Sequence, residues 1–308
     1  MAKIIIPGGN GYLGLSIGRE LVTRGDEVVI LSRRTSMDND GIRFVEWDGR
    51  TLGDWVEELD GANAIIHLTG RRVDVRSTRR NIDDLINSRV QPVRIVGEAL
   101  SQVNHPPEIW IQSSSLAIYG DGKDQLIDET FTPTGLGPRE MVTVCLAWEK
   151  AFDIATQGID RKVLLRIGIG MGGKGDPATK KIAELTKLGL GGKVGNGHQW
   201  VSWIDLRDLM RIFLNALDSK TMNGTYHATS PNPATNAEMM KTFRKVLGKK
   251  FGLPSPSLVA RLGAPLLGSS GNLALVGRRC VPSRLLDEGF IFEHENFEDT
   301  VRYAISKI

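Results

Sequence analysis

A glycine-rich turn near the N-terminus is the strongest chemical signal in the sequence. It reads PGGNGYLG from Pro7, and its glycines have the spacing GxxGxxG. The β-branched run Ile4–Ile6 precedes it and the amphipathic stretch Leu15–Arg24 follows. Between a strand and a helix, glycines allow a tight turn and a close approach to a pyrophosphate, which the free N–H groups of the helix N-terminus bind. The motif in this context predicts a nucleotide site. Its expected contacts are Gly8, Asn10, Gly11, Tyr12, Leu13 and Gly14.

The end of the second expected strand, Val28–Leu31, distinguishes NAD from NADP. NAD-binding proteins place an Asp or Glu there, which binds the ribose 2′-hydroxyl. This sequence has Ser32, Arg33 and Arg34 instead, and the two acids of the region precede the strand. A serine can donate a hydrogen bond, and two guanidinium groups can bind a 2′-phosphate. We therefore expect NADP(H), with an exposed basic loop as the alternative interpretation.

The elements that must position these residues alternate along the first half of the chain. Strands are expected at Ile4–Ile6, Val28–Leu31, Phe44–Trp47, Ala64–Leu68, Ile109–Gln112 and Val163–Ile167, with helices at Leu15–Arg24, Ile82–Leu100 and Met141–Thr156. Such alternation implies a parallel sheet with right-handed crossovers. We expect an α/β fold with a doubly wound parallel sheet, the Rossmann architecture, over residues 1–170, completed by parts of 200–230. Within that later part, Trp200–Asp205 is expected to form one strand. Residues 171–199 and 231–308 would form a smaller C-terminal substrate-binding region.

Composition narrows the class of protein. The chain has 308 residues, of which 41% are hydrophobic, and a formal charge of +3. These values are ordinary for a globular protein and argue against disorder and against nucleic acid as a partner. Cys145 and Cys280 fit neither a disulfide framework nor a zinc site, and His67 has no partner at ligand spacing, so no metal is expected. Without a spanning segment or an export signal, we expect a cytoplasmic protein with no membrane partner.

Several segments resemble the extended short-chain dehydrogenase/reductase family. They are GGNGYLG (Gly8–Gly14), HLTG (His67–Gly70) and SSSLAIYG (Ser113–Gly120). Later segments resemble one atypical subgroup, whose members are usually called epimerase family proteins and sometimes cell division inhibitors. These are GNGHQWVSWIDLRDL (Gly195–Leu209), ATSPNPATNAE (Ala228–Glu238) and VPSRLLDEGFIF (Val281–Phe292). The resemblance spans essentially the whole chain, and it implies the fold and the cofactor more firmly than the reaction.

The resemblance also implies where the rest of the cofactor would lie. After the third strand, Trp47 and Asp48 would border the adenine. After the fourth, the ribose and pyrophosphate would be lined by Leu68, Thr69 and Gly70. Ser88 and Arg89 would lie on a helix that approaches the cofactor from the side, and after the sixth strand the nicotinamide would be flanked by Arg166, Gly168 and Ile169.

The expected catalytic helix departs from the family pattern. Redox members use a Tyr and a Lys four residues apart, together with a Ser or Thr. Because positions i and i+4 share a helix face, the ammonium lowers the phenol pKa, and the phenol then exchanges a proton during hydride transfer. The matching hydroxyl here is Ser115, which would polarise the substrate. Counted back from Glu149, the Tyr and Lys positions hold Met141 and Cys145, and neither can perform that transfer.

Other candidates for the chemistry have more ordinary interpretations. Tyr119–Lys123 and Tyr303–Lys307 both spell YxxxK. The first contains turn residues and the second lies outside the family order, so neither is expected to be catalytic. Asp128 and Glu129 could act as acid or base, but a capping or solvated role in a loop is favoured. A helical cysteine beside apolar neighbours, such as Cys145, is expected in the core.

Two clusters remain as candidates for substrate contacts. His198 and its neighbours form a polar and aromatic group that suits a substrate pocket, although the tryptophans could equally be core. The predicted contacts are Gln199, Trp200, Ser202 and Trp203. Five arginines lie in Arg71–Arg80, where a solvated face is favoured over an anion site. The sequence thus favours an NADP(H)-dependent oxidoreductase or epimerase, monomeric or homodimeric, acting on an unidentified small molecule. A non-catalytic NADP(H) sensor is the alternative, supported by the missing Tyr/Lys pair.

Overall fold

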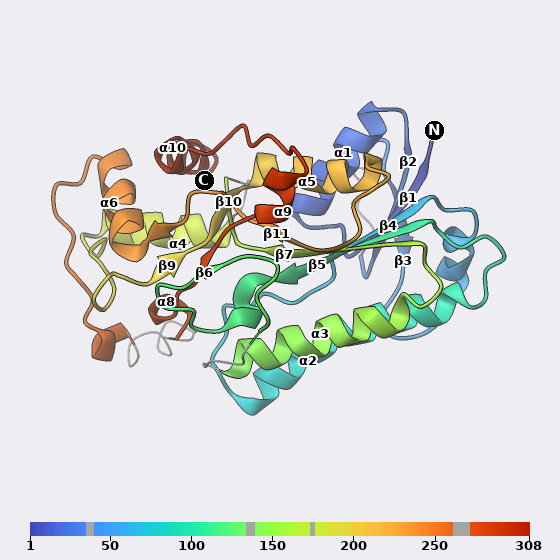
Figure 1. The fold of residues 1–308 in the computed structure, drawn as a ribbon, viewed down its shortest axis with the longest axis horizontal. Coiled ribbons are helices and arrows are strands. Elements are labelled where there is room, and N and C mark those ends of the chain that lie inside the picture. Colours follow the sequence, from blue (N-terminus) through green and yellow to red (C-terminus); the bar gives the residue numbers. More distant parts are fainter. Residues whose placement is uncertain (35–39, 134–138, 173–175, 261–271) are drawn as a thin grey trace.

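A seven-stranded parallel sheet forms the larger part of the molecule (Figure 1). The computed structural model describes residues 1–308 except 35–39, 134–138, 173–175 and 261–271. The strand order is β11-β7-β5-β4-β1-β2-β3. Their bounds are β1 (Lys3–Pro7), β2 (Glu27–Ser32), β3 (Arg43–Glu46), β4 (Ala64–His67), β5 (Ile109–Ser115), β7 (Arg161–Ile167) and β11 (Gly224–Ala228). The order reverses between β1 and β4, so the predicted doubly wound Rossmann fold is confirmed.

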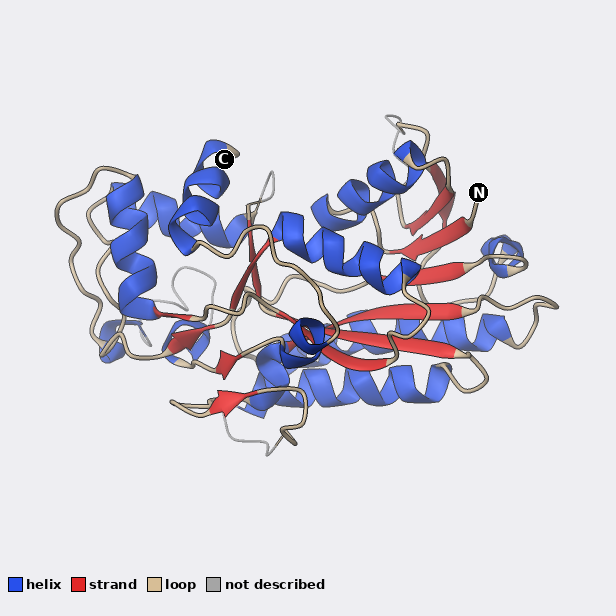
Figure 2. Ribbon diagram, turned by 45° about the horizontal axis from the view of Figure 1, so that its top comes forward, coloured by secondary structure: helices blue, strands red, loops and turns tan. Residues whose placement is uncertain are grey.

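Helices cover both faces of this sheet (Figure 2). One face carries α1 (Tyr12–Thr23) and α5 (Leu206–Asp218), and the other carries α2 (Arg79–Leu100) and α3 (Arg139–Ala155). The β-branched run in β1 explains why both layers form. Ile4 and Ile6 pack with Leu21 of α1, whereas Ile5 packs with Val96 of α2 and Phe152 of α3. Successive strand residues face opposite sides, so a continuous apolar run is stabilised only when both faces are buried.

The C-terminal region contains short strands and three longer helices. These are β8 (Ile169–Met171), β9 (Trp200–Val201), β10 (Trp203–Asp205), β12 (Ala234–Thr235), α4 (Pro177–Lys187), α6 (Asn236–Val246) and α10 (Phe297–Ser306). The single strand expected over 200–205 is therefore two strands. β9 pairs with β12 and β10 pairs with β8. The break falls at Ser202, whose Oγ donates to Arg278 O (2.8 Å) and accepts from Cys280 N (3.0 Å).

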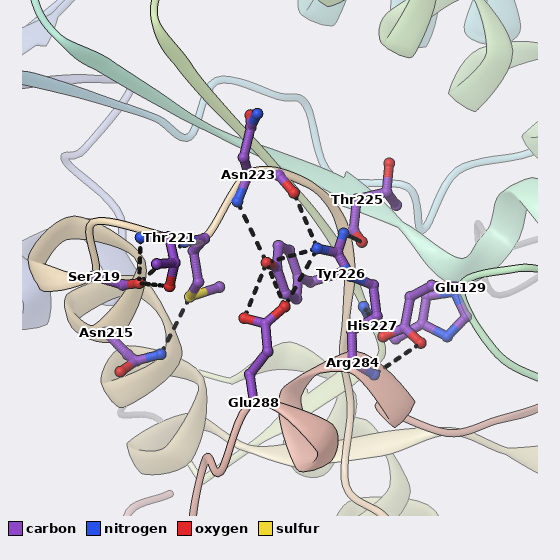
Figure 3. A network of polar contacts seen from close by, with 11 residues as sticks. Glu129, Asn215, Ser219, Thr221, Asn223, Thr225, Tyr226, His227, Arg284 and Glu288 are labelled. Atoms are coloured by element: carbon purple, nitrogen blue, oxygen red, sulfur yellow. Dashed lines mark hydrogen bonds and ion pairs between the residues drawn. The ribbon is translucent and has the colours of Figure 1, made fainter.

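The segment after α8 (Asn272–Leu275) returns to the main sheet and packs against its edge strand, β11. It forms β13 (Arg279–Cys280), paired with β6 (Leu126–Ile127), and then α9 (Ser283–Asp287). Figure 3 shows Arg284 lying against Tyr226 of β11. The guanidinium carbon is 3.9 Å from the ring centroid, and Nη1 donates to Thr225 O (2.8 Å). The Tyr226 hydroxyl lies 2.9 Å from a Glu288 carboxylate oxygen. The VPSRLLDEGFIF segment thus fastens the C-terminal region to the Rossmann sheet.

Candidate cofactor and active site

A cavity of about 830 Å³ opens at the carboxyl ends of β1 to β4, around the switch point of the sheet. This is where ligands bind in doubly wound folds. Ten of the predicted cofactor residues line it: Gly8, Asn10, Ser32, Arg33, Trp47, Asp48, Leu68, Thr69, Gly70 and Ser88. A second cavity of about 540 Å³ shares Asn10 and Arg33 and adds Arg34. The structure therefore brings together segments that are distant in sequence.

The glycine turn leaves room for a ligand at one position and none at the others. Gly8 has a φ of +75°, and a Cβ there would lie 2.8 Å from Thr69 Cα. A Cβ on Gly14 would lie 2.4 Å from Gly9 Cα. By contrast, a Cβ on Gly11 would meet nothing within 4 Å. Gly11 is the N-cap of α1, which has no side-chain cap, so the first N–H groups of the helix are available to an anion.

The end of β2 carries the cations expected from the sequence. Ser32 is buried, and its Oγ accepts a hydrogen bond from Arg34 N (3.3 Å). Arg33 and Arg34 are exposed, and neither forms an ion pair with a described residue. The carboxylate of Asp48 is occupied by hydrogen bonds within its own loop. It accepts from Arg50 N (2.7 Å) and Thr51 N (2.9 Å), which hold its pKa below the usual value. No carboxylate of the described residues therefore competes with a phosphate for the two arginines.

Arg89 lies behind the cavity wall rather than on it. It is 7% exposed, and it donates to Leu85 O (3.1 Å) and Arg71 O (2.9 Å). Its guanidinium lies 5.0 Å from the Trp148 ring, and burial lowers its pKa. A Cβ on Gly70, which lines the cavity, would lie 3.4 Å from this guanidinium. No described carboxylate pairs with it, so its charge favours an anion in the adjoining space.

Residues missed by the sequence analysis complete the lining. They are Gly49, Arg50, Arg71, Arg72, Asp74, Val75, Asp84, Asn87, Gln91 and Pro92. Two signals were available. Asp84, Asn87 and Gln91 lie at helical spacing around Ser88, and therefore share its face of α2. Arg71 and Arg72 belong to the arginine run, for which a solvated face was favoured. Arg71 pairs with Asp84 (2.6 Å) at the cavity.

Arg166, expected beside the nicotinamide, lies in a buried polar network. Its Nε and Nη2 bind the Glu149 carboxylate at 3.0 and 2.8 Å, and Glu149 also accepts from Ser114 Oγ at 2.7 Å. Arg166 Nη1 donates to Tyr119 Oη (2.6 Å). The same Tyr119 oxygen lies 2.6 Å from His227 Nε2. His227 Nδ1 is 3.0 Å from the Val281 carbonyl, which can only accept. The proton is therefore on Nδ1, and Tyr119 donates to Nε2.

Burial keeps this network in one protonation state at neutral pH. It lowers the pKa of His227 to about 4 and raises the pKa of Tyr119 above its ordinary value. Tyr119 is 1% exposed, whereas the side chain of Lys123 is 80% exposed and pairs with Asp121. They share no helix face, so this YxxxK is not a catalytic pair. Tyr303 lies in α10 and Lys307 is its C-cap residue, with the ammonium 5.1 Å from the ring centroid.

The helix positions of the missing Tyr and Lys are apolar. Cys145 is 1% exposed and packs in a cluster with Leu116, Ile118 and Met141. Burial raises the pKa of its thiol to about 12, so it is not a nucleophile at neutral pH. Ser115 is half-buried at the end of β5, and its Oγ accepts from Ala117 N (3.2 Å). No described residue accepts its proton, which leaves one donor available there.

The predicted substrate residues are held by internal contacts to different degrees. Trp203 is fully buried in the C-terminal core and donates to Asn232 O (2.7 Å), and Ser202 is 5% exposed. The burial of Trp203 matches the alternative interpretation of a core residue, and the Ser202 hydroxyl is engaged by Arg278 O and Cys280 N. Gln199 and Trp200 are half-buried, with Trp200 Nε1 donating to Asp124 (3.0 Å).

Other predicted site residues lie in loops and at junctions. Asp128 accepts from Thr130 N (3.0 Å), as expected of a capped loop, and Glu129 accepts from His227 N (2.9 Å). Gly168 N donates to Ala228 O, and Ile169 N to Ser202 O. These two residues connect the main sheet to the C-terminal region and lie outside both cavities. Tyr12, Leu13 and Gly14 belong to the first turn of α1.

Two classes of site find no support in the described residues. No group of three or more His, Cys, Asp or Glu side chains there could hold a metal ion. No helix in the same residues is long and apolar enough to cross a membrane.

Comparison with known proteins gives matches over nearly the whole chain. The sequence profile of the NAD dependent epimerase/dehydratase family matches residues 4–228, and that of a domain of unknown function, DUF1731, matches residues 255–304. Epimerase family protein YfhF of Bacillus subtilis is 28% identical, over 99% of this chain and 97% of its own. Human epimerase family protein SDR39U1 is 28% identical over 94% of both chains.

Solved structures give the same picture of the fold. The structure of human SDR39U1 with NADPH has a TM-score of 0.86 at 24% identity, covering 99% of this chain and all of that one. A nucleoside-diphosphate sugar epimerase from Corynebacterium glutamicum has a TM-score of 0.76 at 26% identity, covering 99% of this chain and 58% of that one.

Proposed function

Because the chain belongs to the NAD dependent epimerase/dehydratase family, we propose that it binds NADP(H) in the cavity at the switch point of the sheet. The observation that carries the proposal is the end of β2, where Ser32, Arg33 and Arg34 stand in place of the acid that NAD requires. The NADPH in the structure of human SDR39U1 supports the same choice. Tighter binding of NADPH than of NADH in a calorimetric titration is the expected result.

The surrounding residues fit the parts of this cofactor. The open space at Gly11 and the uncapped N-terminus of α1 suit the pyrophosphate. Arg33 and Arg34 would hold the 2′-phosphate, since guanidinium groups form charge-assisted pairs with phosphate oxygens. Trp47 and the loop of Asp48 would border the adenine. Arg89, which is buried and has no acidic partner among the described residues, would add to the positive potential behind the cavity wall.

We further propose that the protein is an oxidoreductase or epimerase acting on a small molecule. When bound, the cofactor supplies hydride transfer at its nicotinamide ring. Ser115 lies at the carboxyl end of β5, beside β7, and no described residue accepts a hydrogen bond from its hydroxyl. Its role would be to donate a hydrogen bond to the substrate oxygen on which charge develops. Ser113 and Ser114 cannot take this role, because each already donates internally.

The chemistry can be tested without knowing the natural substrate. NADPH carrying deuterium at C4 would be incubated with the protein and a panel of carbonyl compounds and sugar nucleotides. Loss of the label, or its transfer to a product, is the expected result. The Ser115→Ala variant should be about 100-fold slower, the usual effect of removing one such donor. Its NADPH affinity should be unchanged, and the exposed control Ser306→Ala should behave like the wild type.

A non-catalytic NADP(H) sensor is the second candidate. It is favoured by the apolar environment of Met141 and Cys145, which leaves no proton donor and no fixed cation at those positions. A sensor would bind NADPH tightly and leave the C4 label intact with every compound tested. That outcome would refute the proposed hydride transfer but would still support the proposed binding of NADP(H).

A further inference from the structure

One end of the C-terminal region combines exposed apolar side chains with lysines. We refer to it as the basic apolar tip. Its apolar members, with their exposed fractions, are Leu188 (76%), Leu190 (47%), Phe251 (69%), Leu253 (54%), Leu258 (66%) and Val259 (57%). Its basic members, all exposed, are Lys187, Lys193, Lys249 and Lys250. Soluble proteins rarely gather this many exposed apolar side chains in one place unless the surface binds something.

Backbone hydrogen bonds hold the two segments of the tip together. Leu253 N donates to Gly189 O (2.7 Å), and Gly192 N donates to Leu253 O (3.2 Å). Ser255 N donates to Lys193 O (2.9 Å). The approach is too close for side chains at the contact, since a Cβ on Gly192 would lie 2.4 Å from Pro254 N. Figure 1 shows the chain that follows α6 at the end of the molecule opposite the N-terminus.

The tip lies in a part of the sequence without acids. There is no Asp or Glu from Leu185 to Ile204, and none from Met239 to Leu286. Lys245, just before the tip, pairs with Glu298 of α10. The four lysines of the tip form no ion pair with a described residue. The tip is therefore strongly cationic, although the whole chain carries only +3.

We propose that the basic apolar tip docks on the surface of an anionic lipid bilayer. Its leucines, valine and phenylalanine would enter the boundary between headgroups and acyl chains, with the lysines among the lipid phosphates. Peripheral binding needs both parts, since apolar contact and electrostatic attraction are each weak alone. A nucleic acid would use the lysines but leave the aliphatic side chains in water. A second copy, docked tip to tip, would place lysine against lysine.

Surface docking is compatible with the absence of a spanning helix in the described residues. The expectation of no membrane partner came from the lack of a spanning segment, which does not bear on a surface site. Docking through the tip would also leave the cofactor cavity accessible, because that cavity lies at the ends of β1 to β4 in the Rossmann sheet.

Vesicle sedimentation tests the proposal. The whole protein would be mixed with vesicles of phosphatidylcholine alone, or with 30% phosphatidylserine (about a third anionic lipid), at physiological salt. Binding to the anionic vesicles only is expected, with release at high salt. The Lys249→Glu/Lys250→Glu variant should bind at least about 25-fold more weakly, since each lysine near such a surface contributes about fivefold. The Phe251→Ser/Leu253→Ser variant should lose at least about tenfold.

Matched controls separate docking from general effects. Ile154→Ser and Lys220→Glu alter an exposed apolar and an exposed basic residue away from the tip, and both should bind vesicles like the wild type. Retained NADPH binding would show that each variant is folded. Because Cys145 and Cys280 are buried, a fluorophore on a Leu258→Cys variant would report the tip alone. Brominated lipids should quench it if the tip enters the acyl region.

Several results would overturn the proposal. One is failure of the wild type to sediment with anionic vesicles. Another is unchanged binding by the Phe251→Ser/Leu253→Ser variant without quenching, which would indicate a general polyanion surface. A third is self-association that the same variant abolishes while vesicles have no effect, which would make the tip an interface between copies of the chain.

Discussion

Gly11 and Gly14 lie three residues apart in one turn, and the structure gives them different reasons to be glycine. A Cβ on Gly14 would press into the backbone of Gly9, whereas a Cβ on Gly11 would enter open space. Gly14→Ala should therefore lower the free energy of unfolding by about 2–3 kcal/mol, as overpacking does. Gly11→Ala should leave stability within about 0.5 kcal/mol but weaken NADPH binding at least about tenfold. Urea denaturation and calorimetry measure both, and equal effects of the two variants on stability would contradict the assignment.

Individual residues of the site differ in how far the sequence could predict them. The glycine turn and the pair Ser32 and Arg33 could be predicted as candidates, because each has its chemistry within a short local motif, and both segments line the cavity. The polar network of Arg166 was missed because its partners, Glu149 and Tyr119, come from distant elements, and no local pattern shows that they are buried together. Arg72 was missed for a related reason, since a run of arginines looks the same in sequence whether it faces solvent or a cavity.

At the scale of elements, the contact between α9 and β11 has a testable consequence. Arg284 links the carbonyls of Asn223 and Thr225 to the ring of Tyr226 and to Glu288. Arg284→Ala should lower the free energy of unfolding by about 2–3 kcal/mol, because the partly buried Thr225 carbonyl and the Tyr226 hydroxyl lose their charged donor. Arg302→Ala, which removes an exposed i,i+4 pair with Glu298, should cost less than about 0.5 kcal/mol. A similar loss for both variants in urea denaturation would show that α9 is not a fastening element.

Elements with a complete local pattern were predicted well, and those that depend on tertiary partners were not. Strands β1, β2 and β4 contain continuous apolar runs buried on both faces, so their type and their place along the chain followed from sequence. The run over 200–205 reads as one strand because its apolar residues are contiguous. In the fold its two halves find different partners, and the polar contacts of Ser202 interrupt it.

At the scale of the whole molecule, two buried histidines make stability depend on pH. Burial lowers the pKa of His67 to about 3 and of His227 to about 4, from an unfolded value of 6.5. Between pH 6.5 and 4 the unfolded chain therefore binds protons that the folded protein does not. The free energy of unfolding should fall as pH falls through this range, by up to about 1.4 kcal/mol per unit for each histidine.

The variant His227→Gln separates this effect from other titrating groups. It should be less stable than the wild type at pH 7, because Tyr119 and the Val281 carbonyl lose their partner. Below pH 6 its stability should fall less steeply with pH, by about 1.4 kcal/mol per unit. Urea denaturation at pH 7, 6 and 5 gives the slopes, and parallel slopes for the two proteins would exclude His227 as a source of the pH dependence.

The arginines after β2 should make the protein select NADP(H) over NAD(H), and paired titrations of NADPH and NADH test this selection most directly. Wild type, Arg33→Ala and the exposed control Arg302→Ala would each be titrated by calorimetry. NADPH should bind the wild type more tightly than NADH. Arg33→Ala should weaken NADPH about 10–100-fold, the loss of one charge-assisted contact, and leave NADH unchanged. Equal affinity of the wild type for both cofactors, or an equal loss of both in Arg33→Ala, would contradict the account.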